Sequence, residues 1–181
     1  MAITLYRPTD AEEAYNLWGA NCGPSAMAAL LGVELSVIRT HISNWKGYTT
    51  PSMARDTLRS AGAKCDYGRN GDWPQIGMVC IQFGGPWCAP NAHPIEQYKR
   101  SHYIAVHGSA VYDVNCDKWI SRGHWNTLIA PEIARLYERS DRTWYPRSCI
   151  SVHELPSDTI AIRPRYTPSK RSKDFVQGSL F

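Results

Sequence analysis

The segment NCGPSAMAALLG, residues 21–32, predicts a helix with both of its ends marked in the sequence. Pro24 suits the first helical turn, where the backbone N–H that proline lacks has no partner within the helix, and Gly32 suits the position just past the end. The residues between them are apolar or small, so a sheet or another helix can approach closely. We therefore expect residues 21–32 to form a central, mostly buried helix.

Two more helices and a set of strands are expected after this segment. Ser36 is the expected cap of a helix over 36–45, and Thr50 followed by Pro51 marks the start of another that stops at Gly62. Apolar runs and alternating patterns predict strands at 63–67, 77–83, 102–107, 110–115 and 148–155, with a further helix at 131–139. This order indicates an α+β fold in which N-terminal helices pack on a mostly antiparallel sheet.

The chain has the length and composition of one domain. Of its 181 residues 43% are hydrophobic and 20% are charged, so it can bury a core. We assign residues 1–163 to this domain and residues 164–181, which are polar and basic, to a flexible C-terminal tail. The stretch 84–100 is rich in Gly and Pro and predicts a long surface loop without regular structure. The sequence leaves open whether this loop covers a site.

The net charge of +4 is concentrated near the C-terminus. Residues 1–159 contain equal numbers of basic and acidic side chains, whereas five basic residues and one acid follow from Ile160 onward. A neutral body gives no support to nucleic-acid binding by the folded domain. No apolar run approaches the roughly 18 residues of a membrane helix, and the N-terminus lacks the pattern of a secretion signal. We therefore expect a cytoplasmic protein that does not enter a membrane.

The six cysteines show no metal-binding pattern. No two of them form a CxxC pair. Cys88 and His93 lie five residues apart in the loop, which is weak evidence for a metal site. Disulfides require an oxidising compartment, and the absence of a secretion-signal pattern argues against such a location. We expect no metal or organic cofactor and interpret most of the cysteines as small buried apolar residues.

Cys22 differs from the others because it lies at the start of the predicted helix. Unpaired N–H groups and the helix dipole stabilise a thiolate there and lower its pKa. A thiolate nucleophile needs a histidine to accept and return its proton, and His102 opens the first strand of the predicted hairpin. A turn near residues 108–109 brings Asp113 and Asn115 back to the same end, and either can orient the imidazole. These residues predict a Cys-His-Asp/Asn triad.

The motif NCGPSAMAALLG, the later HYIAV strand and the VYD strand that follows together resemble the papain-like cysteine peptidases, and most closely those that process bacteriocins with double-glycine leaders. The resemblance covers about residues 15–117. It implies a papain-like fold and the cleavage of peptide or isopeptide bonds in a peptide or protein substrate. It also implies that Cys22 is the nucleophile, that His102 is the general base and acid, and that Asp113 or Asn115 orients the imidazole.

The sequence departs from this family at the oxyanion hole. The family usually has a glutamine six residues before the cysteine, where its amide and the backbone N–H of the cysteine hold the oxyanion. Here that position is Asn16, one methylene shorter, and Asn21 is the other candidate donor. Loss of one donor lowers the rate by about 10²–10³-fold. A non-catalytic binding module of the same fold is therefore an alternative function, as is an amidase or transamidase.

The last five residues, QGSLF, form a second motif. Gln177 followed by Leu180 and Phe181 resembles the short peptides by which bacterial replication and repair proteins dock on the DNA sliding clamp. Such a tail presents two apolar anchors to a groove while the glutamine sets the register. A sliding clamp is therefore a candidate partner.

Overall fold

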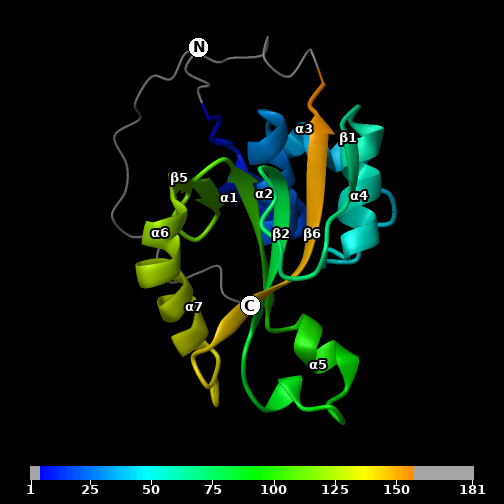
Figure 1. Cartoon of the computed structure of the whole chain (residues 1–181). Helices are drawn as coiled ribbons and strands as arrows, with labels where there is room; N and C mark the ends of the chain where they lie inside the picture. Colours follow the sequence, from blue (N-terminus) through cyan, green and yellow to red (C-terminus); the bar gives the residue numbers. More distant parts are fainter. Residues whose placement is uncertain (1–4, 157–181) are drawn as a thin grey trace.

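The computed structural model describes residues 5–156, and these form three layers (Figure 1). One face of a six-stranded sheet is covered by α1 (Ala11–Trp18), α2 (Cys22–Leu31), α3 (Leu35–His41) and α4 (Pro51–Ser60). The other face is covered by α6 (Arg122–His124), the π-helical turn η2 (Trp125–Ile129) and α7 (Ala130–Leu136). The N-terminal helices therefore pack on the sheet as the sequence predicts, and a second helical layer lies behind it.

The sheet is antiparallel throughout. Its strands are β1 (Lys64–Tyr67), β2 (Ile76–Phe83), β3 (Ser101–His107), β4 (Ala110–Asp113), β5 (Lys118–Ser121) and β6 (Trp144–Glu154). They lie in the order β1-β6-β2-β3-β4-β5, so β2 to β5 form a meander and β6 inserts between β1 and β2. The α+β fold class is confirmed at this level.

Strand β2 separates two hydrophobic cores, because successive side chains of a strand point to opposite faces. Met78 and Cys80 pack with the N-terminal helices, whereas Val79 and Ile81 pack with Trp125 and α7. Helix α2 is buried from Gly23 to Leu31. Its small residues allow it to lie directly against the middle of the sheet, which confirms the expected central helix.

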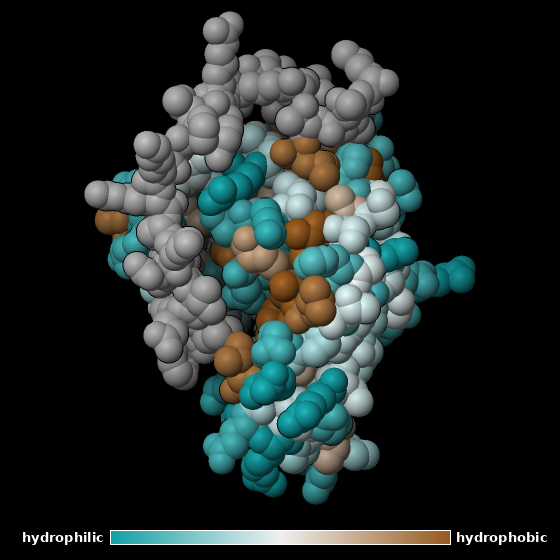
Figure 2. Space-filling view, turned by 90° about the vertical axis from the view of Figure 1, so that its left-hand side faces the viewer, coloured by the Kyte–Doolittle hydropathy of each residue, from teal (hydrophilic) through white to brown (hydrophobic). Residues whose placement is uncertain are grey.

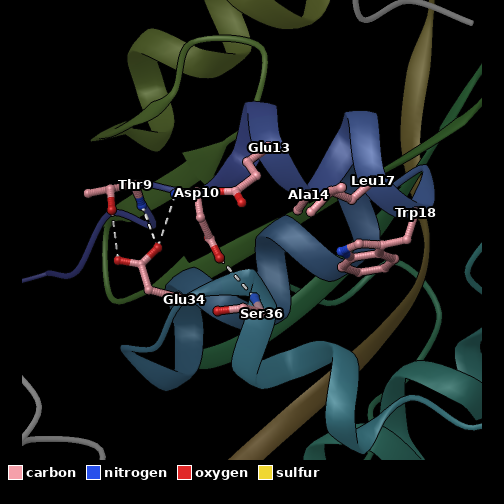
Figure 3. A pocket seen from close by; sticks show the side chains of 8 residues that line it. All are labelled: Thr9, Asp10, Glu13, Ala14, Leu17, Trp18, Glu34 and Ser36. Atoms are coloured by element: carbon pink, nitrogen blue, oxygen red, sulfur yellow. Dashed lines mark hydrogen bonds between the residues drawn. The ribbon is translucent and has the colours of Figure 1, made fainter.

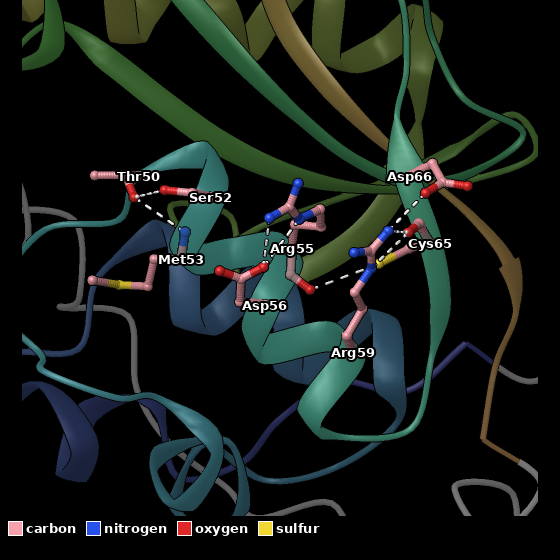
Figure 4. Close-up of polar contacts among 8 residues, drawn as sticks. All are labelled: Thr50, Ser52, Met53, Arg55, Asp56, Arg59, Cys65 and Asp66. Atoms are coloured by element: carbon pink, nitrogen blue, oxygen red, sulfur yellow. Dashed lines mark hydrogen bonds and ion pairs between the residues drawn. The ribbon is translucent and has the colours of Figure 1, made fainter.

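The expected ends of α2 and the expected start of α4 are confirmed, whereas α4 ends at Ser60, before the expected Gly62. Helix α2 ends at Leu31, and Gly32 after it has a φ of 72°, the left-handed conformation that glycine adopts without strain. Helix α4 begins with the Thr50 hydroxyl, which accepts a hydrogen bond from the N–H of Met53 at 3.1 Å (Figure 4). At its other end, the guanidinium of Arg59 donates to the carbonyl of Cys65 and to the Asp66 carboxylate, which ties α4 to β1.

The expected cap of the next helix is wrong. Helix α3 starts at Leu35 and ends at His41, so Ser36 lies inside it and the helix is shorter than 36–45. Its first N–H groups are capped from a distance, because the carboxylate of Asp10 accepts from Leu35 and Ser36 at 2.8 and 2.9 Å. The carboxylate of Glu34 in turn accepts from the backbone N–H groups that precede α1 (Figure 3). No local pattern around residue 36 encodes such a reciprocal arrangement.

A hollow of about 310 Å³ lies beside these caps, between α1 and α3 (Figure 3). It is lined by Thr9, Asp10, Glu13, Ala14, Leu17, Trp18, Glu34 and Ser36. The carboxylates of Asp10 and Glu34 are held in the hydrogen bonds of the two helix starts. None of the residues of the expected triad lines it.

The stretch 84–100 contains regular structure, so its prediction as an irregular loop is wrong. A 3₁₀ turn, η1, covers Pro86–Cys88, and helix α5 covers Pro94–Tyr98. The side chain of His93 caps α5 by accepting from the N–H of Ile95 at 3.2 Å. Proline interrupts strands but suits the first turn of a helix, so a proline-rich stretch can contain short helices.

Other boundaries moved or were missed. Helix α1 and strand β5 were not expected, β4 ends at Asp113 instead of residue 115, and β6 begins at Trp144, before the expected residue 148.

Within residues 5–156 no single helix has the length and hydropathy to cross a membrane, and α2 and α3 meet that test only as a pair bent by 103°. The face on the side of α6 and α7 shows apolar patches among hydrophilic side chains (Figure 2).

Gly77 in β2 provides a test of the packing between β2 and β6. Its φ is +155°, and a Cβ at this position would lie 1.9 Å from the carbonyl oxygen of Ile150. We expect Gly77→Ala to lower the free energy of unfolding by about 3 kcal/mol, measured by chemical denaturation. Gly123→Ala is the matched control, because open space surrounds that position, and it should leave stability within about 0.5 kcal/mol. Equal stability of the two variants would contradict the described register.

Candidate active site

Cys22 is the first residue of α2, and the residue is half-buried. The side chain of Asn21 shapes this helix start. Its oxygen accepts from the N–H of Gly23 at 3.2 Å, and its nitrogen donates to the carbonyl of Gly47 at 3.0 Å. The backbone N–H of Cys22 comes first in the helix and has no intrahelical partner. The helix start therefore presents a thiol together with a free donor and the positive end of the dipole.

The sulfur of Cys22 reaches the backbone of β3. The N–H of Tyr103 donates to Sγ at 3.4 Å, although the two residues are 81 positions apart in sequence. Strand β4 pairs with β3 only from Ala105 to His107, so the N–H of Tyr103 lies past the end of that ladder. The shortness of β4 thus leaves a backbone donor for the thiol.

His102 and Asp113 form a buried pair beside this contact. Nε2 of His102 lies 2.9 Å from Oδ1 of Asp113, and the residues are 6% and 0% exposed. The pairing of Ala105 with Tyr112, continued along the strands, brings Asn115 opposite His102, as the turn at 108–109 predicts. The side chain of Asn115 is exposed, however, and only its backbone N–H takes part, donating to Oδ1 of Asp113 at 2.8 Å. Of the two candidates, Asp113 is the one whose side chain contacts the imidazole.

The charges of these groups stabilise one another. Burial is the largest influence on Cys22 and opposes the thiolate, but the charge of His102, a hydrogen bond with it and the N–H of Tyr103 leave the pKa of the thiol lowered. Burial likewise opposes the imidazolium, yet Asp113 and Cys22 raise the pKa of His102 well above its usual value. For Asp113, burial is outweighed by His102 and by hydrogen bonds from Trp125 and Asn115, so the pKa of its carboxyl is lowered. The three shifts favour the thiolate, the imidazolium and the carboxylate together.

Three neighbouring side chains, those of Cys80, Tyr103 and Tyr137, favour their neutral forms near pH 7. Burial raises the pKa of Cys80 to about 11, although hydrogen bonds with Tyr103 and Ser101 oppose the rise. Burial and the charge of Cys22 raise the pKa of Tyr137 to about 12. Burial and the neighbouring Cys80 raise the pKa of the Tyr103 phenol as well. Titration of Cys22 near neutral pH therefore reports on His102 and Asp113.

The two expected oxyanion donors lie in different settings. Asn16 is exposed on α1, and its side chain makes no hydrogen bond within residues 5–156. The amide of Asn21 caps the helix start and bonds to Gly47. The backbone N–H of Cys22 is the donor that the fold itself supplies next to the sulfur.

The sequence also singled out the C-terminal motif and the other cysteines. Gln177, Leu180 and Phe181, expected to dock on a sliding clamp, lie outside the described residues. Among residues 5–156, no three His, Cys, Asp or Glu side chains are close enough to hold a metal ion. All six cysteines are free thiols.

The indole N–H of Trp125 donates to Oδ2 of Asp113 at 2.6 Å, a contact that the sequence did not predict. In the sequence, this tryptophan could line a cleft or pack in the core, and packing is the default interpretation. A buried indole requires an acceptor, but nothing in the sequence says which one.

No family model, no curated protein and no solved structure matches this chain.

The charge chain predicts how alkylation of Cys22 depends on pH. Iodoacetamide should label Cys22 with a midpoint below about 8.5, the pKa of a free thiol. In His102→Ala the midpoint should rise, because the cation that favours the thiolate is gone. Peptide mass mapping provides an internal control in Cys116, since burial raises the pKa of that thiol to about 12. Labelling of Cys22 that is indifferent to the histidine would contradict the pairing.

The contacts of Asp113 and Asn115 predict different effects of substitution. Asp113→Asn removes the carboxylate charge beside His102, so the labelling rate of Cys22 at pH 6 should fall by about tenfold or more. Asn115→Ala keeps the backbone N–H that contacts Asp113 and should change that rate by less than about twofold. The reverse order of effects would transfer the orienting role to Asn115.

Proposed function

We propose that this protein is a thiol hydrolase, a cysteine peptidase of papain-like fold that cleaves peptide or isopeptide bonds. The observation that carries this proposal is the chain of contacts from the partly exposed Cys22, at a helix start, through His102 to the buried Asp113. The order of a cysteine-bearing helix followed by a sheet with the histidine and the aspartate also supports it. The resemblance of the three motifs to papain-like peptidases points to the same chemistry.

Cys22, His102 and Asp113 supply the groups that the acylation step requires. The thiolate of Cys22 attacks the carbonyl carbon, a C–S bond forms, and the carbonyl oxygen becomes an oxyanion beside the backbone N–H of Cys22. When the intermediate collapses, the C–N bond breaks and His102 protonates the leaving amine. Nε2 of His102 faces Asp113, so Nδ1 is the nitrogen that serves the sulfur and the substrate.

A water molecule completes the cycle. His102, now neutral, accepts a proton from the water as the oxygen attacks the acyl-enzyme. The C–S bond breaks, the carboxylic acid leaves, and the thiolate–imidazolium pair is restored. Asp113 remains ionised throughout and stabilises the imidazolium. The thiolate and the imidazole supply the nucleophile and the proton transfers, so the proposed reaction needs no cofactor.

The test combines a covalent probe with hydrolysis. Peptidyl acyloxymethyl ketones should modify Cys22, and the wild-type protein should generate new N-termini in unfolded casein, detected by mass spectrometry. Cys22→Ala should abolish both, with hydrolysis lowered by about 10⁴-fold or more. Cys88→Ala is the matched control, because that thiol is similarly exposed and makes no contact with His102 or Asp113 in the described structure.

The outcomes separate the alternatives. Acylation followed by transfer to an added amine, without hydrolysis, would indicate a transamidase. A Cys22 that is reactive to iodoacetamide but forms no acyl or ketone adduct would contradict the proposal. That result would favour the non-catalytic binding module, which the exposed position of Asn16 supports.

A further inference from the structure

The carboxylate of Asp113 is completely buried, and both of its oxygens are occupied. Oδ1 accepts from Nε2 of His102 and from the N–H of Asn115, whereas Oδ2 accepts from the indole N–H of Trp125 at 2.6 Å. A carboxylate with no access to water needs such donors, because an unpaired buried charge is strongly disfavoured. The donors also determine which oxygen faces the imidazole.

We infer that Trp125 is a positioning residue of the Cys22–His102–Asp113 site, a role that rests on the proposed function. Its indole N–H holds Oδ2 and thereby directs Oδ1 toward His102. The same hydrogen bond favours the ionised form of Asp113. Through the imidazolium of His102, the indole acts on the thiolate of Cys22 without touching it.

The structure holds this indole in one place. Trp125 is fully buried, and its ring meets Trp144 at 5.3 Å and Trp73 at 6.3 Å between centroids, both edge-on. The guanidinium of Arg122 lies over the ring of Trp73, 5.2 Å from its centroid, and completes the cluster. Rings packed on two sides leave the N–H of Trp125 little freedom to turn away from Asp113.

The backbone around Trp125 is also specialised. Trp125 begins the π-helical turn η2, which interrupts the helical segment between α6 and α7. A π turn inserts a residue into the helical repeat, costs hydrogen-bond geometry and is frequent at functional sites. Here the turn begins at the residue that contacts Asp113. Donor, ring cluster and helix irregularity therefore coincide at one residue.

The test is the pH profile of Cys22 labelling by iodoacetamide, which requires no turnover. Trp125→Phe keeps a large ring and removes the N–H. We expect it to raise the midpoint and to slow labelling at pH 6 by about 10- to 100-fold, the usual worth of a hydrogen bond to a charged group. Trp144→Phe is the matched control, since it disturbs the same ring cluster but leaves the N–H of Trp125 in place, and it should stay within about twofold.

A second variant separates hydrogen bonding from packing. Benzothienylalanine at position 125 keeps the bicyclic shape and replaces the N–H with sulfur. Loss of labelling like that of Trp125→Phe would support the inference, and a profile like that of the wild type would overturn it. In an Asp113→Asn background, Trp125→Phe should add little, because the carboxylate on which it acts is gone.

These outcomes are distinct from those of the proposed function. A shifted labelling profile together with no hydrolysis would reject the peptidase activity and retain Trp125 as the residue that positions Asp113. Hydrolysis together with unshifted profiles in both position-125 variants would retain the peptidase and reject the role of Trp125.

Discussion

The arrangement around Cys22 depends on one buried charge, the carboxylate of Asp113. Fully removed from solvent, this group stays ionised only because His102, Trp125 and the backbone of Asn115 donate to it. Its charge favours the imidazolium, and the imidazolium favours the thiolate. Each step is an interaction between opposite charges in a setting where water screens them weakly.

This charge chain joins the two hydrophobic layers of the protein. Cys22 packs against the core beneath the N-terminal helices, whereas Trp125 belongs to the core on the opposite face of the sheet. The strands β3 and β4 lie between them and carry His102 and Asp113. Because β4 stops at Asp113, the chain turns away and leaves the N–H of Tyr103 for the sulfur. The site therefore requires both layers and the exact length of one strand.

Local patterns were reliable where a single segment carries the physical cause. The proline and glycine that bound α2, the cap of α4 and the turn between β3 and β4 were all predicted, since each depends on residues within a few positions. Predictions from local patterns failed where a group distant in sequence determines a helix boundary. Asp10 caps α3 across 25 positions, and no pattern near Ser36 records it. The stretch 84–100 was misread because its prolines begin helical turns.

The sequence by itself determined that a cysteine at a helix start would be followed by a hairpin that carries a histidine with an aspartate and an asparagine near its end. It could not decide between those last two residues. Only the tertiary structure did so, because the end of β4 turns the side chain of Asn115 to solvent and leaves Asp113 buried against His102. Trp125 likewise acquires its role from packing, since the acceptor that a buried indole finds depends on which elements meet around it.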